Sequence, residues 1–147
     1  MCRVTALQRP RVTADDEQGA AAGAAVSRFV KGFKSIEKMI VVYDDLDLPF
    51  GSLKISYERG SGGHKGLDSI MSALKTKSFT RIRIGISPTS ASGEIKKPEG
   101  ERNVEKFILG EFAHSELTLL KKTLARAGEA IEAIISEGRE KAMNLFN

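Results

Sequence analysis

The sequence is poor in the residue types that stabilise small secreted domains or build metal clusters. Its 147 residues include one cysteine, Cys2, two histidines and no tryptophan. A single cysteine excludes an internal disulfide framework and a metal site made of several thiolates. The apolar runs are all well short of the roughly 20 residues that span a bilayer. We therefore expect a cytoplasmic protein without a membrane segment.

What is present is the composition of an ordinary globular domain. Hydrophobic residues make up 41% and charged residues 29% of the chain, and this length is typical of a single domain. The formal net charge of +4 permits a polyanionic partner without requiring one, because many basic proteins bind no nucleic acid. A basic cluster lies between residues 75 and 83, at Lys75, Lys77, Arg81 and Arg83.

The N-terminal segment differs from the rest of the chain. Residues 1–22 show no clear period, and their arginines resemble a targeting peptide that Asp15 interrupts. We expect residues 1–22 to form a poorly defined segment and residues 23–147 to form one α/β domain. A helix is predicted from Ala24, because one face of it would carry Val26, Phe29, Val30 and Phe33.

Periodicity in the remaining chain predicts strands mixed with helices. The predicted strands are 4–7, 40–43, 53–57 and 80–86, and the predicted helices are 67–74, 104–112 and 115–147. This order indicates a sheet flanked by helices. The strand at 80–86 has an apolar face of isoleucines and an opposite face with Arg81, Arg83 and Gly85. The last helix has an apolar stripe that we expect to face the core, at Leu117, Leu120, Leu124, Ala127, Ile131, Ile134 and Ile135.

The residues that can bind a ligand or take part in catalysis follow two of the predicted strands. The strand at 40–43 leads into a predicted acidic turn with Asp44, Asp45 and Asp47. The next strand leads into the glycine loop, residues 60–66, whose backbone N–H groups can face a substrate oxygen or a phosphate. Close carboxylates also suit Mg²⁺ or Ca²⁺, but this spacing matches no known binding loop, and we expect no metal. The ordinary interpretations are solvated turn carboxylates, a loop-to-helix connector and a solvated strand face.

Four segments then carry a more specific signal. They read V-V-Y-D-D-L-D-L-P-F-G, G-S-G-G-H-K-G-L-D-S-I, F-T-R-I-R-I-G-I and V-E-K-F-I-L-G-E-F. In order and spacing they resemble the motifs of the bacterial-type peptidyl-tRNA hydrolase family, from about residue 24 to the C-terminus. One such motif is weak evidence, whereas four in register are specific.

The resemblance implies an enzyme that hydrolyses the ester between a peptide and tRNA, so that the tRNA is recycled. It implies a twisted mixed sheet flanked by helices, tRNA as the partner, a monomer, and neither a metal nor a cofactor. The position that matches a catalytic residue of the family is Asp44, as the acidic partner of a histidine. His64 matches the family's loop histidine, which lines the cleft, and is the second candidate catalytic residue of this chain. The substrate-binding positions are Gly62, Gly63, Lys65 and Gly66. The tRNA-binding position is Arg83, and the patch around it extends to Arg81, Lys54 and Lys77.

The sequence also departs from the family. The N-terminal strand and the segment G-N-P-G-x-x-Y-x-x-T-R-H-N, with the family's principal catalytic histidine, have no counterpart here. The loop asparagine is replaced by Lys65, which meets an oxyanion or a phosphate only as a point charge. We expect low turnover, with His64 as the only candidate base near Asp44. A fragment or a frameshifted product would explain these departures, and a non-catalytic RNA-binding protein on the same fold remains the alternative.

Overall fold

The computed structural model describes residues 5–6 and 36–147, so the helix predicted from Ala24 and most of residues 1–22 lie outside it. The strands are β1 (Thr5–Ala6), β2 (Ile40–Pro49), β3 (Leu53–Tyr57) and β4 (Thr80–Ser87). Within the described residues, the helices are the 3-10 turn η1 (Ile36–Lys38), α2 (Lys65–Leu74), α3 (Glu101–Leu109), α4 (His114–Glu137) and α5 (Arg139–Phe146). The predicted α/β class is confirmed.

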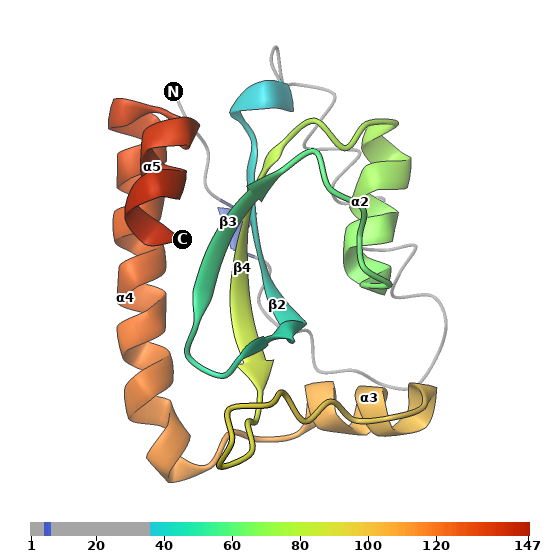
Figure 1. Ribbon diagram of the computed structural model, residues 1–147. Coiled ribbons are helices and arrows are strands. Elements are labelled where there is room, and N and C mark those ends of the chain that lie inside the picture. Colours follow the sequence, from blue (N-terminus) through green and yellow to red (C-terminus); the bar gives the residue numbers. More distant parts are fainter. Residues whose placement is uncertain (1–4, 7–35) are drawn as a thin grey trace. The chain divides into compact units, whose positions relative to one another are not determined.

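The strands form a four-stranded sheet in the order β1-β2-β4-β3 (Figure 1). β2 and β4 run in the same direction, since Thr80 N–H donates to Met39 O (3.1 Å) and Phe50 N–H donates to Ser87 O (2.7 Å). β3 runs against β4, because the start of β3 lies beside Gly85, near the end of β4. The sheet is therefore mixed, as the resemblance implies.

The chain divides into two compact units, and the division cuts β2, β3 and β4. The first unit contains the described residues up to Val41 together with Ser56–Arg81, and so includes the glycine loop and α2. The second unit contains Val42–Ile55 and Ile82–Asn147, and so includes α3, α4 and α5.

In the first unit, α2 buries one apolar face. Leu67, Ile70 and Leu74 are buried, as their i, i+3, i+7 spacing predicts. Phe79, just before β4, is also fully buried, at 0% exposure. The helix begins at Lys65 rather than at the predicted Leu67, because His64 caps its first turn.

In the second unit, the connection between β2 and β3 crosses β4 at Gly85. Gly51 N–H donates to Gly85 O (3.1 Å), and Gly85 N–H donates to Ser52 O (2.9 Å). A Cβ on Gly85 would lie 1.9 Å from Pro49 O, so only glycine allows the two backbones to approach this closely. Every residue of β4 except Arg83 is buried. The ordinary interpretation of this strand, a solvated face, is therefore wrong.

β2 extends through the three acids that the sequence predicted to form a turn. It continues to Pro49, and the turn to β3 begins at Phe50. Leu46 O accepts a hydrogen bond from Ser87 Oγ on β4 (2.7 Å), and Asp45 pairs with Arg83 on the same strand. These contacts keep the acidic segment extended, so the predicted position of the turn is wrong.

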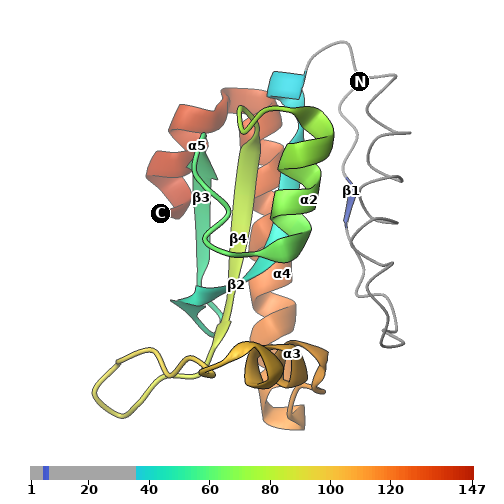
Figure 2. The same ribbon diagram turned by 90° about the vertical axis from the view of Figure 1, so that its right-hand side faces the viewer.

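α4 and α5 pack side by side (Figures 1 and 2). The single helix predicted for 115–147 is broken at Gly138, whose φ of +92° favours glycine. The last residue, Asn147, ties this end of the chain to β3. Its Oδ1 accepts from Ile55 N–H (2.7 Å), and its Nδ2 donates to Ile55 O (3.1 Å).

The buried residues of α4 are small, namely Thr123, Ala127, Ala130 and Ala133. Thr123 Oγ1 donates to Gly51 O at 3.0 Å, so small side chains bring the helix close to the turn between β2 and β3. Leu117, Leu124 and Ile135 are exposed instead. The predicted inward stripe of leucines and isoleucines is therefore wrong for these residues.

The loop between β4 and α3 folds back on itself rather than running as a plain connector. Thr89 and Ile95 form an isolated antiparallel bridge, and Ser90 N–H donates to Glu94 O (2.8 Å). Figure 2 shows this loop reaching out from the end of β4 before the chain enters α3. Lys97, near its end, forms an ion pair with Asp47 of β2.

Candidate functional site

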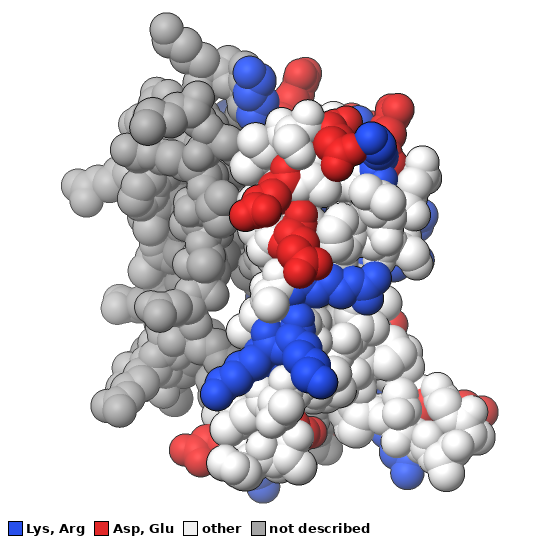
Figure 3. Space-filling view, turned by 90° about the vertical axis from the view of Figure 1, so that its left-hand side faces the viewer, with Lys and Arg blue, Asp and Glu red and all other residues white. Residues whose placement is uncertain are grey.

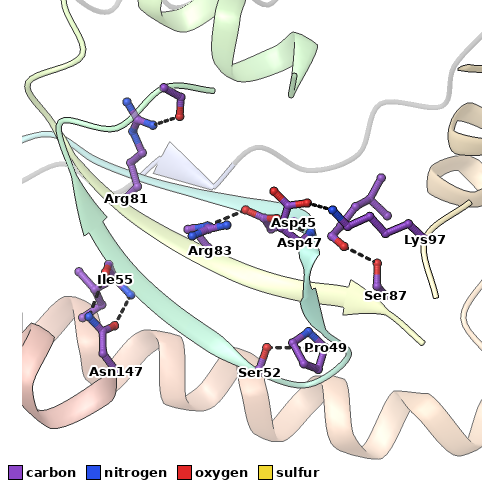
Figure 4. A network of polar contacts seen from close by, with 12 residues as sticks. Asp45, Asp47, Pro49, Ser52, Ile55, Arg81, Arg83, Ser87, Lys97 and Asn147 are labelled. Atoms are coloured by element: carbon purple, nitrogen blue, oxygen red, sulfur yellow. Dashed lines mark hydrogen bonds and ion pairs between the residues drawn. The ribbon is translucent and has the colours of Figure 1, made fainter. Parts of the chain in front are cut away.

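An ion pair joins Arg83 of β4 to Asp45 of β2 (Figure 4). Arg83 Nε donates to Asp45 Oδ2 at 2.6 Å, and the two side chains are 20% and 11% exposed. The other oxygen of Asp45 accepts from the backbone N–H of Asp47 (2.7 Å). Because both oxygens of Asp45 accept hydrogen bonds, this carboxylate orients the arginine and the strand instead of serving as a base.

The charge of Arg83 is reinforced by its surroundings. The hydrogen bond to Asp45 raises the pKa of Arg83 above its ordinary value, partial burial opposes this rise, and the negative charges of Asp45 and Asp47 add to it. The guanidinium is therefore charged at any physiological pH. Since Asp45 takes Nε, the two terminal nitrogens can donate to an anion such as a phosphate.

Arg81, which the sequence placed in the same basic patch, lies in the interior of the first unit. It is 0% exposed, its Nη1 donates to Gly60 O (2.9 Å) and its Nη2 donates to Arg59 O. Its guanidinium also lies 4.8 Å from the centre of the Phe79 ring, a favourable cation–π geometry. The expected tRNA contact is therefore corrected: Arg81 holds the backbone that leads into the glycine loop.

The glycine loop has positive φ angles at two positions. Gly62 and Gly63 have φ of +64° and +83°, a region that favours glycine. Ser61 organises the turn, because its Oγ accepts from Gly63 N–H (3.2 Å) and its carbonyl accepts from His64 N–H (3.3 Å). An anion at this loop would therefore compete with Ser61 for the Gly63 amide. Gly66 lies inside α2.

His64 is the N-cap of α2. Its Nδ1 accepts a hydrogen bond from Leu67 N–H at 3.1 Å, which satisfies one of the unpaired amides of the first turn. An accepting Nδ1 carries no proton, so the neutral ring has its proton on Nε2. In this state Nε2 is the donor atom of the ring, and the ring can take up a proton only by giving up the cap.

The remaining predicted site residues are divided between the two units. Asp44 is half-buried on β2, and Lys54 is exposed on β3, both in the second unit. His64, Lys65 and Lys77 belong to the first unit, where both lysines are exposed. The pairing of Asp44 with His64 therefore remains a prediction. The other histidine, His114, is exposed at the start of α4.

Sequence reasoning missed the partner of Arg83. Asp45 was predicted to be a turn residue, and no pattern in one sequence indicates which of three neighbouring acids pairs with an arginine 38 residues away. It also missed Lys97, whose pair with Asp47 is half-exposed on both sides. Such surface pairs are typically worth under ~1 kcal/mol.

Across 36–147, no group of three or more His, Cys, Asp and Glu side chains is arranged to hold a metal ion. Within the same part of the chain, no helix is both long and apolar enough to cross a membrane.

Known proteins resemble this chain in sequence. Residues 13–147 match the family model described as "Peptidyl-tRNA hydrolase". A relative from Pseudothermotoga lettingae named peptidyl-tRNA hydrolase is 42% identical over 85% of this chain and 63% of its own length. A relative of the same name from a Sulfurihydrogenibium species is 39% identical over 85% of this chain and 62% of its own length. The chain thus spans under two thirds of the length of these relatives.

The fold has known counterparts as well. The crystal structure of peptidyl-tRNA hydrolase from Acinetobacter baumannii superimposes with a TM-score of 0.72 at 26% identity. The match covers 86% of this chain and 60% of that protein. The motifs, the mixed sheet and these similarities agree, and the chain belongs to the peptidyl-tRNA hydrolase family.

Proposed function

We propose that this chain acts on peptidyl-tRNA and hydrolyses the ester that joins the peptide to the tRNA. The observation that carries the proposal is the match of residues 13–147 to the peptidyl-tRNA hydrolase family. The activity of this chain is a proposal, because the relatives that carry the name are longer than this chain. A protein that recycles tRNA for translation works in the cytoplasm, and we propose this location.

Arg83 is the residue that we propose to contact a tRNA phosphate. Its Nε is held by Asp45 at 2.6 Å, so the guanidinium is pre-oriented and loses little side-chain freedom on binding. Lys54 and Lys77 are exposed and add positive charge for further phosphates. Contacts of this kind depend on salt and are largely independent of base sequence.

In the first unit, the glycine loop and the start of α2 are proposed to hold the substrate. Gly62 and Gly63 keep side chains away from the approaching ligand, and Gly66 does the same in the first turn of the helix. Lys65 brings a positive charge to the N-terminal end of α2, where the helix dipole also favours an anion. His64, with its proton on Nε2, is suited to donate to the ester carbonyl oxygen as negative charge develops there.

In the second unit, Asp44 is proposed to orient the attacking water. The water oxygen adds to the ester carbonyl carbon, and the bond from that carbon to the ribose oxygen breaks. The ribose oxygen takes up one proton of that water and the other proton passes to solvent, which leaves a free tRNA hydroxyl and a peptide carboxylate. A carboxylate is a weaker base toward water than an imidazole, so we expect turnover ~10²–10⁴-fold below that of a relative with a catalytic histidine.

The second candidate function is binding of tRNA without hydrolysis. It is favoured by one observation, the hydrogen bond from Leu67 N–H to His64 Nδ1. This bond occupies the lone pair that a general base would use. Binding through Arg83 needs no base and would persist.

The test is release of the blocked amino acid from an N-acetyl-aminoacyl-tRNA by the purified chain, with the Pseudothermotoga lettingae relative for comparison. His64→Asn keeps an N-cap but removes the imidazole, whereas His64→Ala removes both. We expect slow release by the chain, at least about tenfold slower release by Asp44→Asn, and equal losses in the two His64 variants.

Three other outcomes would contradict parts of the proposal. Release by His64→Asn at the wild-type rate would contradict the proposal that the imidazole donates to the ester carbonyl oxygen. No release above the protein-free rate, with salt-sensitive tRNA binding intact, would establish the binding-only function instead. A folded chain that neither binds tRNA nor releases the amino acid would overturn both.

A further inference from the structure

Arg81 is a buried cation without a carboxylate partner. It is 0% exposed, and its partners among the described residues are neutral: the carbonyl oxygens of Arg59 and Gly60, the sulfur of Met71 and the ring of Phe79. Its Nε is buried and makes no hydrogen bond to the described residues. A guanidinium stays protonated in proteins, and a buried charge without a counter-charge is costly. An anion bound near Arg81 would lower this cost.

The cations on α4 and α5 differ from Arg81 in both respects. Figure 3 shows Lys and Arg side chains close to Asp and Glu side chains on the face with these two helices. Lys141 of α5, for example, pairs with Glu137 of α4. Water screens such surface charges. The charge of Arg81 lies in the interior, where screening is weak, so it acts more strongly on the groups around it.

The contacts of Arg81 fix the direction of two backbone N–H groups. Its Nη1 donates to Gly60 O at 2.9 Å, and its Nη2 donates to Arg59 O. Figure 4 shows the Arg81 side chain reaching the chain that leads from β3 into the glycine loop. In a planar trans peptide, the C=O of one residue and the N–H of the next point in opposite directions. The N–H groups of Gly60 and Ser61 therefore both point away from the guanidinium.

These two N–H groups are available to a ligand. Neither donates a hydrogen bond to another part of the described chain. Gly60 is exposed and Ser61 is half-buried, and a Cβ on Gly60 would meet nothing within 4 Å. The Gly63 N–H, in contrast, already donates to Ser61 Oγ (3.2 Å). The available donors therefore precede Gly62 and Gly63, the two glycines that the sequence assigned to substrate binding.

We propose that the N–H groups of Gly60 and Ser61 bind one phosphate of the tRNA, and that Arg81 is a positioning residue for this site. The guanidinium polarises the two peptides through their carbonyls, which makes their N–H ends better donors to an anion. It also keeps both N–H groups on the side away from the interior. The inference rests on the proposed function, because it names the part of the tRNA that this loop binds.

The surroundings of the two N–H groups favour a phosphate. A phosphodiester has two unesterified oxygens, and backbone N–H groups are common donors to nucleic-acid phosphates. The nearest cations along the chain are Arg59 and Lys65, and both are exposed. The carboxylate of Glu58 is the nearest negative charge along the chain, and its Oε1 accepts from Ser78 Oγ at 2.8 Å. This hydrogen bond holds the carboxylate at the segment before β4.

The test is amide NMR spectroscopy of the full 147-residue chain at constant ionic strength, with two probes, uncharged tRNA and inorganic phosphate. A hydrogen bond to a phosphate oxygen moves an amide proton downfield. We expect tRNA to move the amide protons of Gly60 and Ser61 downfield together and to move that of Gly63 much less. Inorganic phosphate should move the same two protons, but only at much higher concentration, because it lacks the other tRNA contacts.

Two matched pairs of variants test the two parts of the site. Arg81→Lys and Arg81→Gln can each donate to one of the two carbonyls, but only lysine keeps the charge. Arg81→Gln should bind inorganic phosphate about tenfold more weakly than Arg81→Lys. Gly60→Pro removes the N–H that Gly60→Ala keeps, and it should bind about tenfold more weakly than Gly60→Ala. The Gly60 pair decides if an Arg81 variant does not fold.

The outcomes separate this inference from the proposed function. If tRNA binds but the amide protons of Gly60 and Ser61 do not move, the site is overturned and the proposed function stands. If inorganic phosphate moves them but tRNA does not bind, the proposed function fails and the tRNA assignment of the site fails with it. Equal phosphate affinities of Arg81→Lys and Arg81→Gln would overturn the role of the buried charge.

Discussion

The two arginines of β4, Arg81 and Arg83, lie two residues apart on one face of the strand but have different surroundings. Arg81 is 0% exposed and donates to the carbonyls of Gly60 and Arg59. Arg83 keeps partial exposure and pairs with the carboxylate of Asp45. Backbone carbonyls bind the guanidinium of Arg81 in the interior, so this arginine supports the structure. The Asp45 carboxylate binds only Nε of Arg83, so the two terminal nitrogens of Arg83 can bind a ligand. The comparison teaches that a basic cluster in a sequence combines residues with different roles.

Removal of Arg81 should have the largest effect in this comparison. Arg81→Ala leaves a cavity beside Phe79 and removes two hydrogen bonds to the chain before the glycine loop. We expect it to lower the free energy of unfolding by about 3–5 kcal/mol, measured by urea denaturation. A loss below about 1 kcal/mol would show that the buried contacts of Arg81 contribute little to stability.

Gly85→Ala should have the next largest effect, in the part of β4 that follows Arg83. The added Cβ would lie 1.9 Å from Pro49 O and 2.5 Å from Ser52 Oγ, so the crossing of the β2–β3 connection must shift. We expect a loss of about 3 kcal/mol in the same assay. Gly60→Ala is the control, because its Cβ would meet nothing within 4 Å and should change stability by under about 1 kcal/mol.

Arg83→Gln should give the smallest change in stability, with a distinct effect on binding. The amide can still donate to Asp45, so we expect a loss of about 1–2 kcal/mol. We measure the tRNA association constant K by fluorescence titration at several salt concentrations. The slope of log K against log salt should become less steep by the amount that one phosphate contact contributes. Lys122→Gln is the charge-matched control and should leave this slope unchanged. An unchanged slope for Arg83→Gln would contradict the proposal that Arg83 contacts a tRNA phosphate.

The periodic segments could be predicted from the sequence. β3 was predicted at its observed residues, and α2 differs only at its start, because alternation and an i, i+3, i+7 pattern describe faces that are buried in the structure. The glycine loop that follows β3 was recognised from its composition, and Gly62 and Gly63 have the positive φ angles that favour glycine. Local chemistry is sufficient where glycine conformation and a single buried face decide the structure.

The rest depends on contacts between distant residues. β2 continues through Asp45 because Arg83 pairs with it, although aspartate and proline disfavour strands. α4 buries alanines instead of leucines because Thr123 bonds to Gly51 O, and this close approach requires small side chains. The different roles of Arg81 and Arg83 follow from which acceptors reach them, and strand periodicity assigns both to one face.

The central claim, that this chain binds peptidyl-tRNA and positions its ester but lacks an efficient base, can be tested with imidazole supplied from solution. The measurement is the single-turnover rate of ester release from N-acetyl-aminoacyl-tRNA under saturating protein, at increasing imidazole concentration. A protein-free series corrects for direct catalysis by imidazole. We predict that the rate with protein rises with imidazole concentration well above the protein-free rate. We also predict that Asp44→Asn reduces this imidazole-dependent increase. A rate that matches the protein-free series at every imidazole concentration would contradict the account.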